Sequence, residues 1–120
     1  MPPCYICSPF AGDVPENLRR AVALSRLALG AGHAPLCVHP AIAAGCYGDD
    51  GVPEERKVGL RAVCALVEAV AWAGGDFWLL LRDDGTISAG CQPELDVWRR
   101  EAGRAAVVWR WVDGAPRRDP

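Results

Sequence analysis

The sequence predicts an α/β protein in which helices cover both faces of a parallel sheet, a three-layer sandwich. Short apolar runs alternate with longer helical patterns along the chain. The apolar runs are nearly continuous, as in strands that are buried on both faces. Hydrophobic residues make up 51% of the 120 residues and charged residues 23%, which is typical of one globular domain. We therefore expect a single domain over residues 1–113 and a flexible tail over residues 114–120.

The first part of the chain predicts a strand, a helix and a second strand. Residues 4–8 form a short apolar run that a proline ends. A capping box that starts at Asp13 begins a helix, which ends at the glycines near residue 30. Residues 34–39 form the second strand. The segment 40–52 then shows no periodicity, and a loop of that length is typical of a functional lid or a disordered segment.

The second part repeats the pattern. A helix is predicted over residues 53–72, and the apolar run 77–81 forms the third strand. A polar loop follows at residues 82–92, and it leads directly into a helix over residues 93–102. The last strand covers residues 106–112.

Helices between successive strands imply right-handed crossovers and a parallel sheet. Four strands, or five, most simply give a small flavodoxin-like sheet of order 2-1-3-4. The topological switch point then lies between the first and third strands, where ligands bind in open α/β sheets. The loops 9–13 and 82–92 should face each other across that crevice.

Charge and composition exclude several classes of partner. The net charge is -2 and no basic stripe is present, which argues against binding to a nucleic-acid polymer. No apolar run approaches the length that crosses a bilayer, so we expect no membrane association. The first residues lack the basic and apolar regions of a signal peptide. We therefore expect a cytoplasmic protein with reduced cysteines.

No metal or cofactor is expected. Cys4 and Cys7 have the spacing of a zinc knuckle, but residues three apart on a strand point to opposite faces. Cys37 and His39 share a face of the second strand, yet no second pair with ligand spacing accompanies them. No P-loop, GxGxxG or GxSxG motif is present.

Glu94 is the first candidate catalytic residue. It lies in the first turn of the predicted helix 93–102, where the helix macrodipole favours an ionised carboxylate. An ionised, partly desolvated carboxylate is what an attack on an anomeric carbon requires. The alternative is that Glu94 only stabilises the helix, because Glu is common in first turns.

Two further features lie close to Glu94 in the predicted fold. Ser88 and Gly90, with the backbone through Cys91, could hold a phosphate at the helix N-terminus, or they form an ordinary turn. Tyr5 on the first strand could position a substrate or a carboxylate, and equally it could be a core aromatic residue.

Two aspartates border the third strand. Asp83 lies at the mouth of the crevice, where it could donate a proton or bind ribose hydroxyls, although Asp-Asp-Gly is also a common exposed turn, the interpretation that we favour. Asp76 begins the strand at the opposite edge, so its position alone indicates a turn or cap residue.

Five tryptophans are many for a chain of this size. Trp109 and Trp111 share one face of the last strand, so either another subunit covers them or they fill the core under the flanking helices.

These residues together resemble the nucleoside 2-deoxyribosyltransferase superfamily, in particular its small uncharacterised bacterial and phage members. The resemblance spans roughly residues 5–112. It rests on three segments, which are Tyr5–Phe10 with Gly12, the acidic residue Asp76, and Ile87–Gly90 with Glu94.

The resemblance implies a flavodoxin-like fold, a homodimer or larger homo-oligomer, and cleavage of the N-glycosidic bond of a nucleoside or nucleoside 5′-monophosphate. By resemblance Glu94 is the nucleophile that attacks C1′, Tyr5 is the tyrosine beside it, and Asp76 is a further acidic catalytic residue. The residues expected to contact the substrate are Ser8, Phe10, Gly12, Asp83, Ser88, Ala89, Gly90 and Cys91. Two other classes of function stay open: a non-catalytic nucleotide-binding or sensing module, and a structural or interaction protein.

Overall fold

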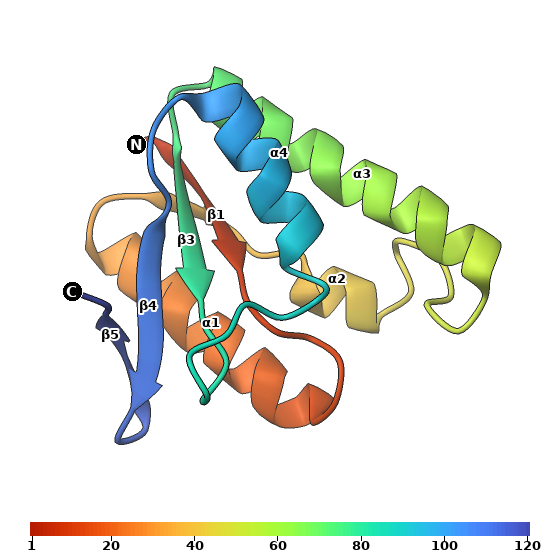
Figure 1. The fold of residues 1–120 in the computed structure, drawn as a ribbon, viewed down its shortest axis with the longest axis horizontal. Helices are drawn as coiled ribbons and strands as arrows, with labels where there is room; N and C mark the ends of the chain where they lie inside the picture. Colours follow the sequence, from red (N-terminus) through yellow and green to blue (C-terminus); the bar gives the residue numbers. More distant parts are fainter.

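The computed structural model describes residues 1–120 and contains one five-stranded sheet with helices on both faces (Figure 1). The strands are β1 (Pro3–Cys7), β2 (Ala34–Leu36), β3 (Asp76–Leu80), β4 (Val107–Val112) and β5 (Ala115–Arg118). The helices are α1 (Val14–Gly30), α2 (His39–Ala43), α3 (Pro53–Trp72) and α4 (Gln92–Ala102). No helix combines the length and the apolar composition that crossing a bilayer requires.

The sheet order is β2-β1-β3-β4-β5. The first four strands are parallel, and β5 runs antiparallel to β4. The predicted α/β class and the parallel order of the first four strands are therefore confirmed, and the added antiparallel strand makes the sheet mixed.

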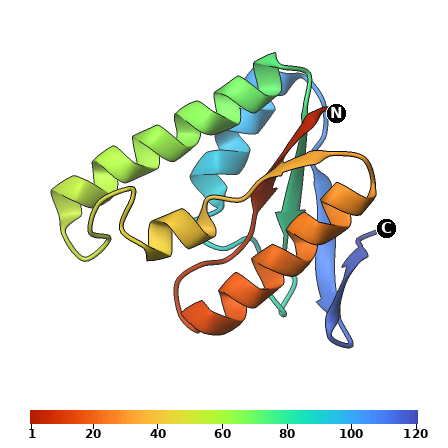
Figure 2. The same ribbon diagram turned by 180° about the vertical axis from the view of Figure 1, so that it is seen from behind.

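The three layers follow from strand alternation. α3 and α4 lie on one face of the sheet and α1 lies on the other (Figures 1 and 2). Along β1, Tyr5 and Cys7 belong to the core cluster that includes residues of α3 and α4, whereas Cys4 and Ile6 belong to the cluster that includes α1. Alternate residues of β1 and β3 thus face opposite sides of the sheet, one side covered by α3 and α4 and the other by α1.

The last residues correct the expectation of a flexible tail. Asp113 and Gly114 form a tight turn with positive φ of 51° and 80°, which turns the chain back antiparallel, as primed hairpin turns do. β5 then pairs with β4, and beyond it Asp119 donates its N–H to the Val108 carbonyl and accepts a 2.7 Å bond from Arg110 Nε. The segment Ala-Pro-Arg-Arg lacks the apolar alternation of a buried strand, so its sequence carries no strand signal.

The segment after β2 also differs from the prediction. β2 ends at Leu36, and α2 occupies part of the segment that was expected to be a structureless lid. Pro40 falls in the first turn of α2, where a missing N–H costs nothing. Farther along, a Cβ placed on Gly59 of α3 would lie 2.4 Å from the Tyr47 carbonyl oxygen, so Gly59 allows the segment 44–52 to pack on α3.

Trp109 and Trp111 pack beneath α1, which supports the second of the two interpretations given to them. The ring centroids of Trp78 and Trp109 are 4.6 Å apart. The guanidinium groups of Arg19 and Arg20 lie 5.2 and 5.0 Å from the Trp111 ring centroid.

Candidate functional site

Tyr5 and Glu94 meet on the α3–α4 face of the sheet. The Tyr5 hydroxyl donates a hydrogen bond to Oε1 of Glu94. Tyr5 has no exposed surface, and its ring stacks on Phe77 with centroids 5.5 Å apart and an interplanar angle of 15°. Glu94 is half-buried and is the third residue of α4, because the helix begins at Gln92 rather than at Pro93 as predicted. The structure therefore brings together the two residues that match, by resemblance, a nucleophile and the tyrosine beside it.

Burial determines the protonation of this pair. It raises the pKa of Glu94 from 4.5 to about 7, while the hydrogen bond from Tyr5 acts in the opposite direction. The expectation that the helix N-terminus keeps this carboxylate fully ionised is thereby corrected: near neutral pH about half of it is protonated. Burial, followed by the negative charge of Glu94, raises the pKa of Tyr5 well above its ordinary value, so the phenol stays a donor.

Buried thiols supply part of the apolar surroundings of Glu94. Cys7 and Cys91 are fully buried, and the Cys7 Sγ lies 3.9 Å from the Cys91 carbonyl oxygen. Burial raises the pKa of Cys7 well above its ordinary value, as it does to a lesser degree for Cys64 on α3. Neutral thiols solvate a carboxylate poorly, which is consistent with the raised pKa of Glu94.

The loop before α4 is organised by Ser88. The Ser88 side chain is buried, and its Oγ accepts a 3.2 Å hydrogen bond from the Cys91 N–H. The backbone carbonyl of Ser88 accepts hydrogen bonds from the N–H groups of Cys91 and Gln92, at 3.0 and 3.1 Å. Ala89 and Gly90 are exposed, and their N–H groups donate no hydrogen bond within the protein. Ser88 thus shapes the turn, and the two residues after it present free backbone donors.

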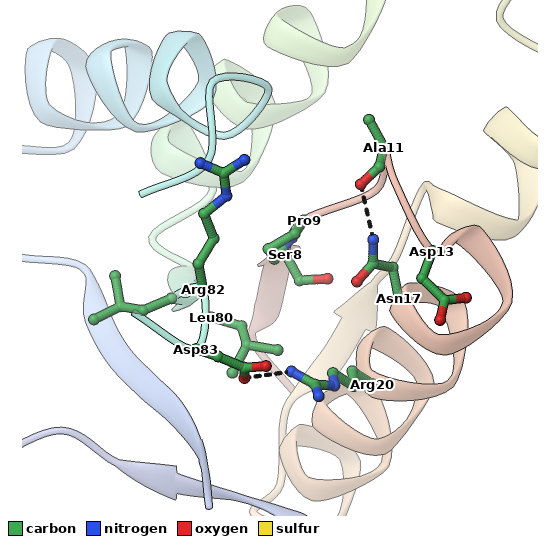
Figure 3. A pocket seen from close by; sticks show the side chains of 10 residues that line it. Ser8, Pro9, Ala11, Asp13, Asn17, Arg20, Leu80, Arg82 and Asp83 are labelled. Carbon is green, nitrogen blue, oxygen red and sulfur yellow. Dashed lines mark hydrogen bonds and ion pairs between the residues drawn. The ribbon is translucent and has the colours of Figure 1, made fainter. Parts of the chain in front are cut away.

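A separate cavity of about 230 Å³ lies at the carboxyl ends of β1 and β3 (Figure 3). The loops after both strands line it, which confirms that they face each other as predicted. Its polar lining residues are Ser8, Asp13, Asn17, Arg20, Arg82 and Asp83.

An ion pair crosses this cavity from α1 to the loop after β3. Nη1 of Arg20 lies 2.8 Å from Oδ1 of Asp83, and Nε of Arg20 lies 3.0 Å from Oε1 of Glu16. Asn17 donates its side-chain amide to the carbonyls of Phe10 and Ala11, both at 3.0 Å, and so holds the loop after β1. The Arg82 side chain is directed away from the Arg20–Asp83 pair (Figure 3).

The predicted site residues therefore do not form one site, because Tyr5 and Glu94 lie on the α3–α4 face whereas the cavity lies at the carboxyl ends of β1 and β3, beside α1. The cavity includes Ser8 and Asp83, together with residues of α1, but neither Glu94 nor Tyr5 lines it. Phe10 lines a different and more open hollow of about 530 Å³ beside α2. Gly12 has a φ of 100° and makes the turn into α1.

Asp76 lies apart from both the Tyr5–Glu94 pair and the cavity, and its catalytic role stays a prediction that rests on the resemblance. It pairs in register with Cys4 at the amino end of β3, and its Oδ2 lies 3.6 Å from Nδ1 of His33. Asp76 is one residue out of phase with Phe77, so strand alternation directs it to the α1 face, away from Tyr5 and Glu94.

The sequence did not predict a role for three polar residues near the carboxyl ends of β1 and β3. Asn17 and Arg20 follow Asp13 at helical spacings of four and seven, and that spacing could have placed them on one face of α1. His39 was considered only as a metal ligand. The structure buries it, with its ring centroid 5.8 Å from that of Phe10.

A family model that describes a domain of unknown function, DUF7768, matches residues 2–106. The match covers most of the chain, so the protein belongs to this family. Neither a curated protein nor a solved structure matches the sequence.

Proposed function

We propose that this protein is an N-glycosidase or deoxyribosyltransferase-like enzyme on a small flavodoxin-like fold, which cleaves the N-glycosidic bond of a nucleoside or nucleoside 5′-monophosphate. The observation that carries the proposal is the hydrogen bond from the buried Tyr5 hydroxyl to the half-buried Glu94 carboxylate. It holds Oε1 in place and leaves Oε2 without a protein donor, so one carboxylate oxygen is available for attack on a sugar carbon.

The reaction follows from the chemistry of this carboxylate. Oε2 of ionised Glu94 attacks C1′, the bond from C1′ to the base nitrogen breaks, and the base leaves with the bonding pair and takes a proton from water. A water molecule, or the nitrogen of a second base, then attacks C1′ and releases the Glu94 carboxylate. Burial supports this role because a poorly solvated carboxylate gives up little hydration on attack, and the Tyr5 hydroxyl stabilises the carboxylate that is released.

The loop before α4 supports a phosphorylated substrate. The free N–H groups of Ala89 and Gly90 precede the first turn of α4, where backbone donors and the helix macrodipole favour an anion. A 5′-phosphate bound there would be held by the same segment that carries Glu94. We therefore expect nucleoside 5′-monophosphates to be cleaved faster than the corresponding nucleosides.

A second candidate function is a non-catalytic nucleotide-binding or sensing module. One observation favours it: the polar cavity at the carboxyl ends of β1 and β3 includes neither Glu94 nor Tyr5. A nucleotide held in that cavity by Ser8, Arg20 and Asp83 would not meet the carboxylate. In this case the Tyr5–Glu94 pair is part of the core.

The test is to incubate the protein with a panel of deoxynucleosides and their 5′-monophosphates and to measure free base by chromatography. Wild type is compared with Glu94→Gln and with Asp96→Asn, an exposed carboxylate in the same helix that serves as the matched control. Base release that is lost in Glu94→Gln and kept in Asp96→Asn supports the enzyme. A Glu94→Gln protein as active as wild type removes Glu94 from the mechanism. No release from any substrate, together with thermal stabilisation by a nucleotide, supports the binding module.

A further inference from the structure

His39, the first residue of α2, has a ring whose two nitrogens have distinct partners. Its side chain is 3% exposed, and Nε2 lies 2.7 Å from the backbone carbonyl oxygen of Ser8. A carbonyl oxygen can only accept, so Nε2 carries the hydrogen and donates it to Ser8. In a neutral ring Nδ1 is then left as the acceptor.

The acceptor nitrogen faces a thiol. The Cys37 Sγ lies 3.7 Å from Nδ1 of His39, within the range of a hydrogen bond to sulfur, and the Cys37 side chain is half-buried. Burial lowers the pKa of His39, so the ring is neutral at neutral pH and its Nδ1 lone pair is available. Side chains are activated for nucleophilic chemistry when a base contacts the nucleophile and a third group orients the base. Here the Cys37 thiol is the nucleophile, His39 is the base, and the Ser8 carbonyl orients the His39 ring.

The other five cysteines lack this combination. Cys4, Cys7 and Cys91 are fully buried. Burial raises the pKa of Cys64, with a further contribution from Glu94. Cys46 is exposed, but no side chain contacts its thiol through a hydrogen bond. Cys37 alone joins partial exposure to a neighbouring base.

We infer that Cys37, activated by His39, is a reactive thiol and a site of modification by small disulfides, of which oxidised glutathione is the test compound. Nδ1 of His39 accepts the thiol proton, and the Cys37 sulfur attacks one sulfur of the disulfide. The S–S bond of the disulfide breaks, and the leaving thiolate takes the proton from His39. The products are a mixed disulfide at Cys37 and one free thiol. This inference does not depend on the proposed glycosidase activity.

Cys46 provides an internal control for the test. The native protein is incubated with oxidised glutathione at pH 7, and the rates of modification at Cys37 and Cys46 are measured by fragment-ion mass spectrometry. We expect Cys37 to react about tenfold faster than Cys46, although it is the less exposed of the two, because Nδ1 of His39, 3.7 Å from the Cys37 sulfur, can take the thiol proton as the sulfur attacks. Exposure alone would give the opposite order.

The variant His39→Gln removes the base and keeps a side-chain amide N–H that can donate to the Ser8 carbonyl. We expect it to lower the rate at Cys37 to that of Cys46 or below, with the Cys46 rate unchanged. An unchanged Cys37 rate in a folded His39→Gln protein overturns the inference. The wild-type protein also tests the inference without any variant. In urea the modification rate of Cys37 should fall to that of Cys46. A Cys37 rate in the native protein that is no greater than the Cys46 rate also overturns the inference.

Discussion

The Tyr5 hydroxyl donates a hydrogen bond to Oε1 of Glu94 across 89 positions of sequence. It joins β1, which lies between β2 and β3 in the sheet, to the first turn of α4. The surroundings of this contact raise the pKa of Glu94 to about 7. A carboxyl group that loses its proton near neutral pH carries a cost in stability, since the folded state holds a proton that the unfolded state releases.

Replacing Glu94 by Gln should therefore stabilise the protein at high pH. Below the unfolded pKa of 4.5 both states are protonated and Glu94 contributes no pH dependence. As the pH rises from 4.5 to about 7, the unfolded state ionises first and wild-type stability falls by up to about 3 kcal/mol. Glu94→Gln lacks this loss and can still accept from Tyr5. Urea unfolding at pH 4 and pH 8 should show similar stabilities at pH 4 and a more stable variant at pH 8. A variant less stable than wild type at pH 8 would contradict this.

Tyr5→Phe should raise the pKa of Glu94 above its wild-type value of about 7. The hydrogen bond from Tyr5 favours the carboxylate form, so its loss favours the protonated acid, while the new ring keeps the stacking on Phe77. Carbon-13 NMR of the glutamate carboxyl carbons follows this titration directly. Tyr47→Phe is the matched control, and a pKa that stays the same or falls in Tyr5→Phe rejects the prediction.

If the protein is the proposed glycosidase, base release should depend on pH through the same group. The nucleophile is ionised Glu94, so kcat/KM should rise with pH through about 7 and level off above it. The midpoint should move to higher pH in Tyr5→Phe. A rate that is constant from pH 5.5 to pH 8.5 would assign the ionisation to another group.

Gly59→Ala should destabilise the protein although Ala is the better helix former. The added Cβ would lie 2.4 Å from the Tyr47 carbonyl oxygen, so the segment 44–52 must move away from α3. We expect a loss of about 1–3 kcal/mol in the free energy of unfolding. Gly30→Ala is the control, because a Cβ there meets nothing within 4 Å. Equal effects of the two substitutions would show that the contact at Gly59 relaxes freely.

Deletion of residues 114–120 should lower the free energy of unfolding by about 1–3 kcal/mol. It removes the β4–β5 ladder and the 2.7 Å pair between Arg110 and Asp119, and it exposes the edge of β4. Thermal unfolding of the truncated and complete chains measures the difference. An unchanged midpoint would mean that the hairpin contributes nothing to the fold.

The elements with strong local signals were predicted closely. The helix predicted over residues 53–72 has the same bounds as α3, because a proline in its first turn and the glycines after it mark both ends. The third strand was predicted over residues 77–81, one residue later than β3, which is Asp76–Leu80. β5 and α2 were missed because neither has a clear pattern of its own: β5 depends on pairing with β4, and α2 is only five residues long.

The order of strands and helices, and the nearness of the loops after β1 and β3, followed from periodicity, capping residues and the rule that parallel strands end at one edge. These signals lie in neighbouring residues and can be read along the chain. That Tyr5 lies near Glu94 was also expected, but tertiary packing alone decided that this pair lies apart from the cavity that Ser8 and Asp83 line. It also decided the protonation of Glu94, because the burial that raises its pKa comes from residues far away in the sequence.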